Sequence, residues 1–463
     1  MNHYTFKPLP SFTAQHTLFQ QGKLKPDWII DYFNICLQNI HDHEPRVQAF
    51  AHLDIDLAQK HLQNSLERYR QSKPLSPIDG MPIGIKDLTI TADMPTSFGS
   101  TCQPILSHFA SLRYDPPFIL ALKQAGAIIL GKTTTSELGL RGLNQTTNPH
   151  DPSRAPGSSS TGSAAAVAAN MLPISSASQA LGSLIRPASY CGTFGYKPTN
   201  NAISRLGNYP LTNSLSSTGF IGSTLHDTII TALQTAQRTG PNPGCAYHLK
   251  QAPNTLERRR PRRIGVVYPA TAWNNTDAHI QTQFKQSIER LESAEIPVSH
   301  FLLGDACEMV SGIFEEGYQL ASKILTYEAT QTLQSFKALP DTCLSDKAEQ
   351  TIEQGLTISI EDYTRSIQRR DELIEALKLC FQGFDVILSP AATSEAPLIT
   401  DYPNYASEYQ DASSLLHLPA ITLPIFQGPN NLPVGLQILS QQYNDQTLIR
   451  CSLWLNNFFN PTQ

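Results

Sequence analysis

The chain has 463 residues, 40% of them hydrophobic, so it can bury a large core, and by length alone it could form two or three domains. Its formal net charge of −5 argues against a global field that attracts nucleic acid or an anionic membrane, and we expect neither as a partner. No segment approaches the roughly 20 apolar residues of a membrane span, and the N-terminus lacks an apolar signal core, so we expect a cytoplasmic protein.

The first 130 residues alternate between expected helices and strands. Apolar residues recur at helical spacing after Asp27, which can cap the first of the helices expected between residues 25 and 72. The other helix of this stretch is expected over residues 57–70. Further along, a short strand is expected over residues 83–85, a helix over 116–124 and a buried strand over 127–130. This alternation is typical of α/β folds.

The rest of the chain continues in the same way. Helices are expected over residues 164–170, 225–238, 276–294 and 361–379, and strands over 264–268, 384–390, 419–424 and 433–438. The weakest patterning falls on residues 300–350 and 391–417. Segments of that kind often form variable, substrate-facing surface.

One motif resembles a phosphate-binding loop without its mechanism. Gly126–Thr133 reads GAIILGKT and fits the pattern G-x-x-x-x-G-K-[ST]. A phosphate-binding loop needs its apolar strand before the first glycine and an open backbone between the glycines. Here the strand-like residues lie between the glycines, so we interpret the segment as a buried strand followed by a glycine turn and expect no nucleotide.

The sequence indicates no metal site. His41 and His43 are two residues apart and do not share a helix face, and no third ligand is evident. The eight cysteines are scattered, and none forms a Cys-x-x-Cys pair. Reduced thiols are the simplest interpretation, and we expect no metal and no cofactor.

Two serines and a lysine stand in contexts that favour catalysis. Gly157–Ser163 reads GSSSTGS and runs directly into an alanine-rich helix, whose N-terminal N–H groups suit a developing negative charge. Alone, such a loop could be a flexible linker. Ser183 follows Gly182 in a turn, and Lys86 lies in the apolar run IGIKDL. A buried lysine must be paired or neutral.

Together with Cys191–Pro198, which reads CGTFGYKP, these motifs resemble the amidase signature hydrolases. Members of that family cleave carboxamides with a Ser–cis-Ser–Lys triad. The resemblance is strong over about residues 40–240 and returns at 385–390 and 433–437, whereas residues 300–420 match poorly. Three separated motifs in the right order make the resemblance specific.

The resemblance assigns a role to each residue of the triad. Lys86 matches the general base, Ser159 the serine on a cis peptide bond, and Ser183, which follows 24 residues later, the nucleophile. The oxyanion hole is expected from the backbone N–H groups of Ala180, Leu181 and Gly182 together with Ser183.

The resemblance also implies the architecture and the reaction. The fold is expected to be α/β, one domain over residues 1–463 with a mixed, twisted central sheet covered by helices on both faces. Within it we expect an N-terminal helical segment (1–75), a signature core (76–240) and a variable, substrate-facing region (300–420). The expected reaction is hydrolysis of a small linear carboxamide through a serine acyl-enzyme, releasing ammonia or an amine. This interpretation is compatible with a homodimer and with a small partner subunit.

Several residues depart from the common family pattern. Leu181 replaces a glycine, so the turn before the nucleophile is expected to use positive φ less freely. Gln179 replaces an aspartate that usually supports the site, although one branch of the family carries glutamine there, and Leu184–Pro187 (LIRP) resembles that branch. Ser158 and Thr161 replace loop glycines. These changes bear on reactivity and pocket width more than on the fold.

Three other functions stay open at this stage. The chain could be the amidase subunit of a glutamine-dependent amidotransferase that makes ammonia for a partner. It could hydrolyse ureide-like substrates such as biuret derivatives, which the glutamine-containing branch makes plausible. It could also be a non-catalytic scaffold in which Leu181 and Gln179 have spoiled the site, although all three triad residues are present.

Overall fold

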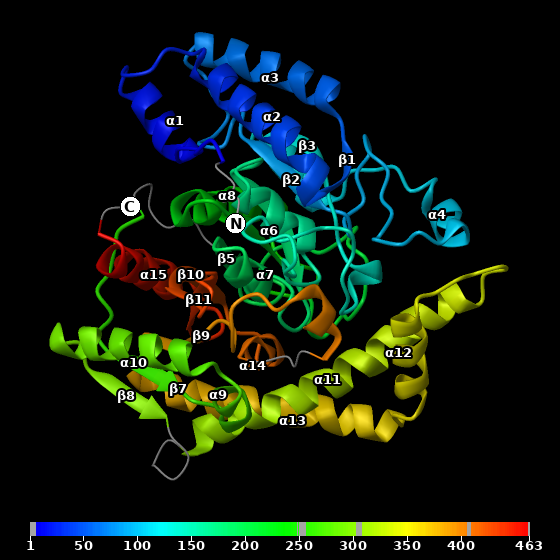
Figure 1. Cartoon of the computed structure of the whole chain (residues 1–463), viewed down its shortest axis with the longest axis vertical. Helices are drawn as coiled ribbons and strands as arrows, with labels where there is room; N and C mark the ends of the chain where they lie inside the picture. Colours follow the sequence, from blue (N-terminus) through cyan, green and yellow to red (C-terminus); the bar gives the residue numbers. More distant parts are fainter. Residues whose placement is uncertain (1–5, 248, 250–255, 302–307, 405–408, 462–463) are drawn as a thin grey trace.

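The computed structural model describes residues 6–247, 249, 256–301, 308–404 and 409–461 (Figure 1). Its strands form one eleven-stranded sheet of order β1-β3-β2-β4-β6-β5-β10-β11-β9-β7-β8. The strands are β1 (Phe50–Leu53), β2 (Pro82–Lys86), β3 (Ile128–Thr133), β4 (Ile174–Gln179), β5 (Phe194–Lys197), β6 (Ser217–Gly222), β7 (Ile264–Val267), β8 (Val298–Phe301), β9 (Val386–Pro390), β10 (Ala420–Gln427) and β11 (Pro433–Leu439).

The sheet is mixed, as the resemblance implied. β2 runs parallel to both β3 and β4, and β7 runs parallel to β8 and β9. The strands between these two parallel ends, from β4 to β9, pair antiparallel. Every residue of β2 and β3 is buried, which is typical of parallel strands covered on both faces.

Helices cover both faces of the sheet. They are α1 (Phe12–Gln20), α2 (Trp28–Val47), α3 (Ile55–Arg70), α4 (Gln103–Phe109), α5 (Pro117–Gln124), α6 (Thr161–Ala168), α7 (Ile185–Tyr190), α8 (Leu225–Thr239), α9 (Ala270–Asn274), α10 (Ala278–Ser293), α11 (Glu308–Lys337), α12 (Asp346–Leu356), α13 (Ile360–Cys380), α14 (Gln410–Leu415) and α15 (Asp445–Phe459). Short 3₁₀ turns lie at Glu137–Gly139, Phe381–Gly383 and Ile399–Asn404. The two or three domains that length alone allowed are therefore wrong, because all strands share one sheet. None of the helices in the described ranges is both long and apolar enough to cross a bilayer.

Most expected elements are present, and the structure adds several that the sequence did not predict. β4 reads ISSASQ and has no run of large apolar residues, and β1 is a short strand between two expected helices. α2 begins directly after Asp27, although the Asp27 side chain makes no capping hydrogen bond. α11 is a 30-residue helix in the region of weakest patterning. Among the described cysteines no disulfide forms, and Cys307 lies outside the described residues.

The interpretation of the phosphate-loop-like segment needs one correction. β3 continues through Gly131 and Lys132 to Thr133, so the expected glycine turn after the strand is wrong. Gly131 is needed within the strand because a Cβ there would lie 2.5 Å from the backbone oxygen of His52. The turn lies before the strand instead, at Gly126, whose φ is +88°.

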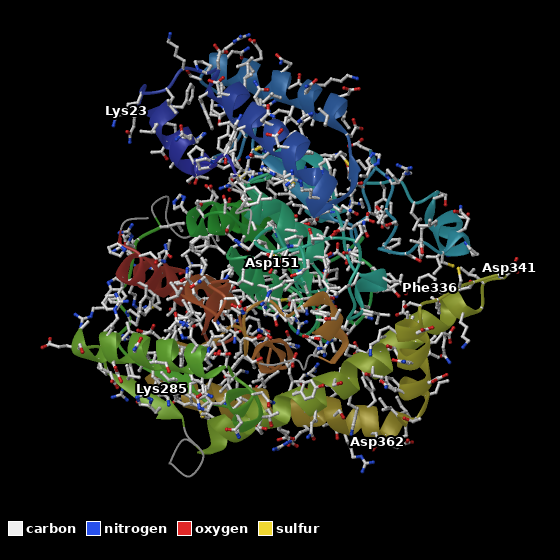
Figure 2. All side chains as sticks on the ribbon, in the orientation of Figure 1. Lys23, Asp151, Lys285, Phe336, Asp341 and Asp362 are labelled. Atoms are coloured by element: carbon white, nitrogen blue, oxygen red, sulfur yellow. The ribbon has the colours of Figure 1, made fainter. Side chains whose placement is uncertain are left out.

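Residues 308–380, called the arm below, form a separate layer made of α11, α12 and α13. α11 packs against both other helices, and the three extend along one side of the molecule toward α4 (Figure 1). The arm packs on the main core through residues such as Phe314 and Ile324, and a second, smaller hydrophobic cluster joins another part of the arm to the core. Phe336, labelled in Figure 2 near the end of α11, belongs to this cluster and makes ring contacts with Phe109 and Tyr209. Ala180, in the turn before Ser183, belongs to it too, so the arm docks beside the expected site.

Candidate active site

Lys86 lies at the end of β2 with its side chain fully inside the protein. Only 1% of the residue is exposed. Its Nζ lies 2.7 Å from Ser159 Oγ, 2.9 Å from Ser160 Oγ and 2.9 Å from Ser178 Oγ. Burial lowers the pKa of Lys86 well below its usual range, because the charged form loses its solvation. A neutral amine has two N–H donors and one lone pair, which suits three hydroxyl neighbours, one of them donating to it.

The serine loop places Ser159 beside this lysine. The peptide bond between Ser158 and Ser159 is cis, at the position that the resemblance implies. The Ser159 carbonyl accepts a hydrogen bond from the Ser136 N–H at 3.3 Å, and Arg186 Nη2 donates to the Ser158 carbonyl at 3.2 Å. Gly157 has φ of +89°, and a Cβ there would lie 2.7 Å from Pro187 Cα. The loop is therefore held from two sides and leaves no room for a larger residue at its start.

The two residues that replace loop glycines are both hydrogen-bonded. Ser158 Oγ accepts from the Gly142 N–H at 3.2 Å, and Thr161 Oγ1 accepts from Asn144 Nδ2 at 2.9 Å. Neither has a positive φ. These departures from the family pattern therefore add contacts to the loop.

Ser183 lies in the turn between β4 and α7, half-buried, on the same small cavity as Ser159. The Ser183 carbonyl accepts a hydrogen bond from the Ser160 N–H at 3.3 Å, which ties the two segments together. Within the described residues the Ser183 hydroxyl makes no hydrogen bond. Its hydroxyl is thus not engaged by the described part of the protein, and the structure shows no hydrogen bond between the Ser159 and Ser183 hydroxyls within the described residues.

The backbone N–H groups of the turn face no protein acceptor. Leu181, Gly182 and Ser183 donate to none of the described residues. Neither Leu181 nor Gly182 has a positive φ, so leucine fits this turn without backbone strain. A turn with three unused N–H groups beside a serine can bind an oxyanion.

Gln179 holds this turn in place through hydrogen bonds made by both the oxygen and the nitrogen of its side-chain amide. Its Oε1 accepts from the N–H groups of Leu184 and Ile185, at 3.1 and 3.0 Å, which are unpaired donors at the start of α7. Its Nε2 donates to Ser414 Oγ at 3.0 Å, and that hydroxyl donates to the Leu181 carbonyl at 2.6 Å. An aspartate could accept from the helix but could not donate to Ser414, so glutamine fits this arrangement.

A larger cavity of about 230 Å³ opens at Ser183. One wall comes from the turn and the loop after β3, the other from the arm, and the lining includes Arg141, Ala180, Leu181, Arg186, Tyr318, Leu325, Thr351 and Gln354. Leu181 lines this cavity and also packs, half-buried, against the main core. The pKa of Arg141 is lowered, first by burial and then by the nearby charge of Arg186. The arm therefore contributes one side of the space that an acyl group would fill.

Sequence reasoning missed three of the hydroxyls around Lys86. Ser160 is the third serine of the loop, and Ser178 lies on β4. Ser176, two residues earlier, accepts from the Lys86 N–H at 2.9 Å. Ser176 and Ser178 lie on one face of a strand, so their spacing could have indicated a hydroxyl-lined surface. In the described part of the chain, no group of three or more His, Cys, Asp or Glu side chains could hold a metal ion.

Comparison with known proteins relates the whole chain to one family. A family model described as Amidase matches residues 31–449. A chloroplastic/mitochondrial glutamyl-tRNA(Gln) amidotransferase subunit of Oryza sativa subsp. indica is 29% identical over 459 residues, covering 89% of this chain and 83% of that protein. A crystal structure of an amidase superposes with a TM-score of 0.82 at 23% identity, over 97% of this chain and 100% of the other. The peptide amidase of Stenotrophomonas maltophilia superposes with a TM-score of 0.79 at 22% identity, over 98% of each chain.

Proposed function

The chain belongs to the amidase family and is an amidase, a hydrolase of carbon–nitrogen bonds, and from this premise we propose that it cleaves a linear carboxamide through a serine acyl-enzyme. The products are ammonia or an amine and a carboxylic acid. The observation that supports this most is the burial of Lys86 among serine hydroxyls, which lowers its pKa well below the usual range. Lys86 has no carboxylate within hydrogen-bonding distance in the described residues, so its lone pair can accept a proton.

In the proposed first half-reaction, Ser183 Oγ attacks the amide carbonyl. Ser159 accepts the proton of Ser183 and passes its own proton to Lys86 Nζ, 2.7 Å away. The carbonyl oxygen, now negative, accepts hydrogen bonds from the N–H groups of the 180–183 turn. Collapse of the tetrahedral intermediate breaks the C–N bond, and the leaving nitrogen takes the proton back from Lys86 through Ser159.

In the second half-reaction, a water attacks the acyl-enzyme. Lys86, neutral again, accepts the proton of the water through Ser159, and the same turn stabilises the second tetrahedral intermediate. The acid is released when the proton returns to Ser183. The relay requires a hydrogen bond between the Ser183 and Ser159 hydroxyls. Catalytic hydrogen bonds of this kind often form only once substrate is bound.

We infer that the acyl group fills the cavity between the turn and the arm. Leu181 narrows that cavity at the oxyanion site, which favours small acyl groups. Arg141 and Arg186 line it as well, so a polar or anionic end on the acyl group would be stabilised there. Both features concern binding and leave the proton relay unchanged.

A substrate panel tests the proposed function. Ammonia release is measured from aliphatic, aromatic, ureide and carboxylate-bearing amides, with the wild-type protein and Ser183→Ala side by side. We expect hydrolysis of a small amide by the wild type alone. No turnover of any amide, or equal turnover by both proteins, would overturn the proposal. The ureides in the panel test the biuret-type alternative directly.

The second candidate function is that of the amidase component of an amidotransferase. It is favoured by the relative from Oryza sativa, whose name is that of an amidotransferase subunit, and which this chain covers over 83% of its length. Under this alternative, ammonia release from glutamine depends on a partner that co-purifies with the chain. Full activity of the isolated protein on a free amide would favour the independent amidase.

A further inference from the structure

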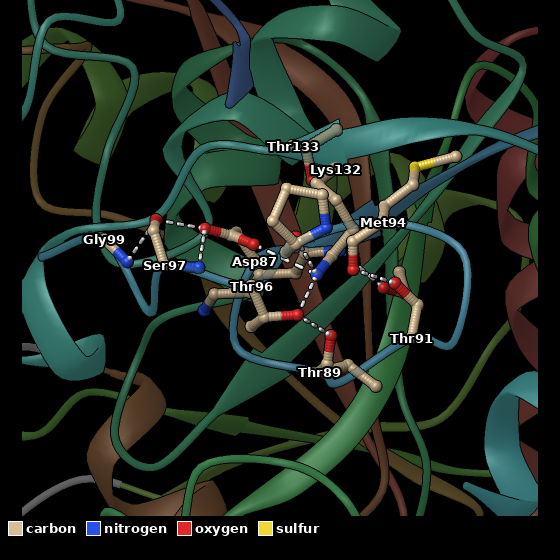
Figure 3. Close-up of polar contacts among 12 residues, drawn as sticks. Asp87, Thr89, Thr91, Met94, Thr96, Ser97, Gly99, Lys132 and Thr133 are labelled. Carbon is tan, nitrogen blue, oxygen red and sulfur yellow. Dashed lines mark hydrogen bonds and ion pairs between the residues drawn. The ribbon is translucent and has the colours of Figure 1, made fainter. Parts of the chain in front are cut away.

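A buried ion pair lies directly behind the candidate base. Asp87 follows Lys86 in the chain, and Lys132 lies on the neighbouring strand β3, where Ile85 is opposite Lys132 in the register (Figure 3). Lys132 Nζ is 3.0 Å from Asp87 Oδ1, and the two side chains are 0% and 2% exposed. Lys132 is the lysine of the phosphate-loop-like motif, and the proposed reaction does not use it.

Each member of the pair is fixed by further hydrogen bonds. Lys132 Nζ donates to Thr96 Oγ1 at 2.6 Å and to the Pro95 carbonyl at 3.3 Å. Asp87 Oδ2 accepts from the Ser97 N–H at 3.0 Å and also from the Ser97 hydroxyl (Figure 3). The pair therefore anchors residues 95–97 against the end of β2.

The anchored loop is linked to Ser159 through residues 135–138. The Phe98 carbonyl accepts from the Leu138 N–H at 2.7 Å, and the Ser136 N–H donates to the Ser159 carbonyl at 3.3 Å. Gly99 packs so closely here that a Cβ would lie 2.5 Å from the Thr135 carbonyl. Residues 135–138 thus lie between the anchored loop and the segment that carries Ser159.

The Asp87–Lys132 pair must be considered together with the other charged side chains near Lys86. Among the strands and the helix that pack against β2, β3 contributes Lys132 alone, and β4 and α6 contribute no charged residue. Further cations are near the site: Arg186 donates to the Ser158 carbonyl, Arg205 lines the Ser159 cavity, Arg141 lines the Ser183 cavity, and the charge of Arg113 acts on Lys132. Of the acids on adjoining loops, Asp93 pairs with Lys123, and Glu137 accepts from the Ser345 N–H.

Asp87 is thus the carboxylate next to the base. Consecutive residues at a strand end point to opposite sides, so Asp87 does not bond Lys86 directly. An unpaired buried carboxylate one residue along the chain from Lys86 would nevertheless favour the protonated lysine, because buried charges are poorly screened.

We propose that Lys132 is a positioning residue that neutralises Asp87, so that Asp87 can hold the 95–99 loop while Lys86 stays uncharged. This proposal rests on the proposed function, since it takes Lys86 as the base. It assigns Lys132 an electrostatic role in the reaction without contact to the substrate.

Three variants of the full-length protein test the proposal through the pH profile of kcat/KM. Lys132→Met leaves Asp87 unpaired, and we expect the rising limb to move to higher pH by about one unit. The double variant Lys132→Met with Asp87→Asn removes both charges and should return the limb toward the wild-type position. Lys132→Arg keeps the charge and should behave like the wild type in pH dependence.

Lys197 offers a matched control. It is also buried, on β5, and burial lowers its pKa to about 7. It lies on none of the elements that pack against β2, so Lys197→Met should leave the limb where it is. A limb that moves equally in Lys197→Met and Lys132→Met would show a general effect of replacing a buried lysine and overturn the proposal.

The remaining outcomes separate this proposal from the proposed function. If Lys86→Met abolishes the limb but Lys132→Met does not move it, Lys132 has a structural role only and the proposal is wrong. If the rising limb persists in Lys86→Met, Lys86 is not the base, and both the proposed function and the proposal for Lys132 are wrong. If Lys132→Met does not fold, the test uses the double variant Lys132→Met with Asp87→Asn. A rising limb at the wild-type pH in that variant supports the neutralising role of Lys132, and a displaced limb contradicts it.

Discussion

The core around β2, β4 and α6 differs from the arm in nearly every physical respect. In the core, the candidate base Lys86 and its neighbours Ser159 and Ser160 are buried, Ser178 is partly buried, and hydrogen bonds join these residues from three parts of the chain. The arm packs on the main hydrophobic cluster through residues such as Phe314 and Ile324 and on the smaller cluster through Phe336, and it contributes one wall of the cavity at Ser183. Under the proposed function, the core supplies the reacting groups and the arm supplies one wall of the acyl cavity, so chemistry and substrate selection would lie in two parts of one domain.

A few polar contacts supplement the hydrophobic docking of the arm. Glu328 of α11 accepts from the Ser214 N–H at 3.0 Å, from the Tyr363 hydroxyl at 2.7 Å, and from the hydroxyls of Thr212 and Ser214. Burial opposes ionisation of Glu328, but the hydrogen bonds from Ser214 and Thr212 outweigh it and lower its pKa. At the outer end of the arm, the Cys343 N–H donates to Cys102 Sγ at 3.2 Å.

The largest effect is expected in the core, from Ser183→Ala. Removing the nucleophile should lower kcat/KM by at least about a thousandfold, while the melting temperature stays unchanged because this hydroxyl makes no hydrogen bond in the described structure. Ser160→Ala is the matched control, since it touches Lys86 but has no place in the proton relay; its loss should be far smaller. Residual activity above a few per cent in Ser183→Ala would remove Ser183 as the nucleophile.

Lys86→Met should be the next most damaging change, with a loss of about 10²–10⁴ in kcat/KM. The pKa of Lys86 is lowered by burial, and the base works in its neutral form, so wild-type activity should rise with pH through that pKa. The rising limb should be absent in the variant. Activity that peaks near pH 5 and falls above it would contradict a neutral lysine. A metal chelator should have no effect on the wild type.

Glu328→Ala tests the arm separately from the chemistry. Because the pKa of Glu328 is lowered in the folded protein, its contribution to docking is present above the ordinary carboxyl pKa and is lost as the pH falls. We expect a destabilisation of about 1–3 kcal/mol and a higher KM for long acyl amides, with kcat for a short amide little changed. Glu316→Ala is the control, because Glu316 lies on the same helix but pairs with Arg369 at the surface. An equal fall of kcat for short and long amides would contradict the separation of the two parts.

The smallest effect is expected from Leu181→Gly, at the boundary between core and arm. If Leu181 narrows the cavity, the variant should admit bulkier acyl groups and raise the kcat/KM ratio of a long to a short amide. Leu181 also packs against the main core, so a loss of stability is expected in addition. An unchanged ratio with a large drop in melting temperature would make Leu181 a packing residue only.

The sequence predicted the serine loop of the core and helix α13 of the arm, but it missed β4 in the core and α11 in the arm, for physical reasons. Glycines and serines at fixed positions identified Lys86, Ser159 and Ser183, because a crowded loop such as that at Gly157 tolerates few alternatives. β4 was missed because its buried serines bond to the lysine and to neighbouring strands, and strand periodicity measures only apolar residues. α11 was missed because its contacts are spread along a long, partly exposed helix. The division into residues 1–75, 76–240 and 300–420 stays a prediction, and residues 302–307 and 405–408 of its last part lie outside the described structure.

The central claim is that Ser183 carries the acyl group, and mass spectrometry of the trapped acyl-enzyme tests it most directly. The protein is mixed with a good amide substrate, quenched in acid within the first turnovers, digested and mapped. We predict one adduct with the mass of the acyl group on Ser183, absent in Ser183→Ala and strongly reduced in Lys86→Met. An adduct on Ser159 or Ser160, or turnover in all three proteins with no adduct on any serine, would contradict it.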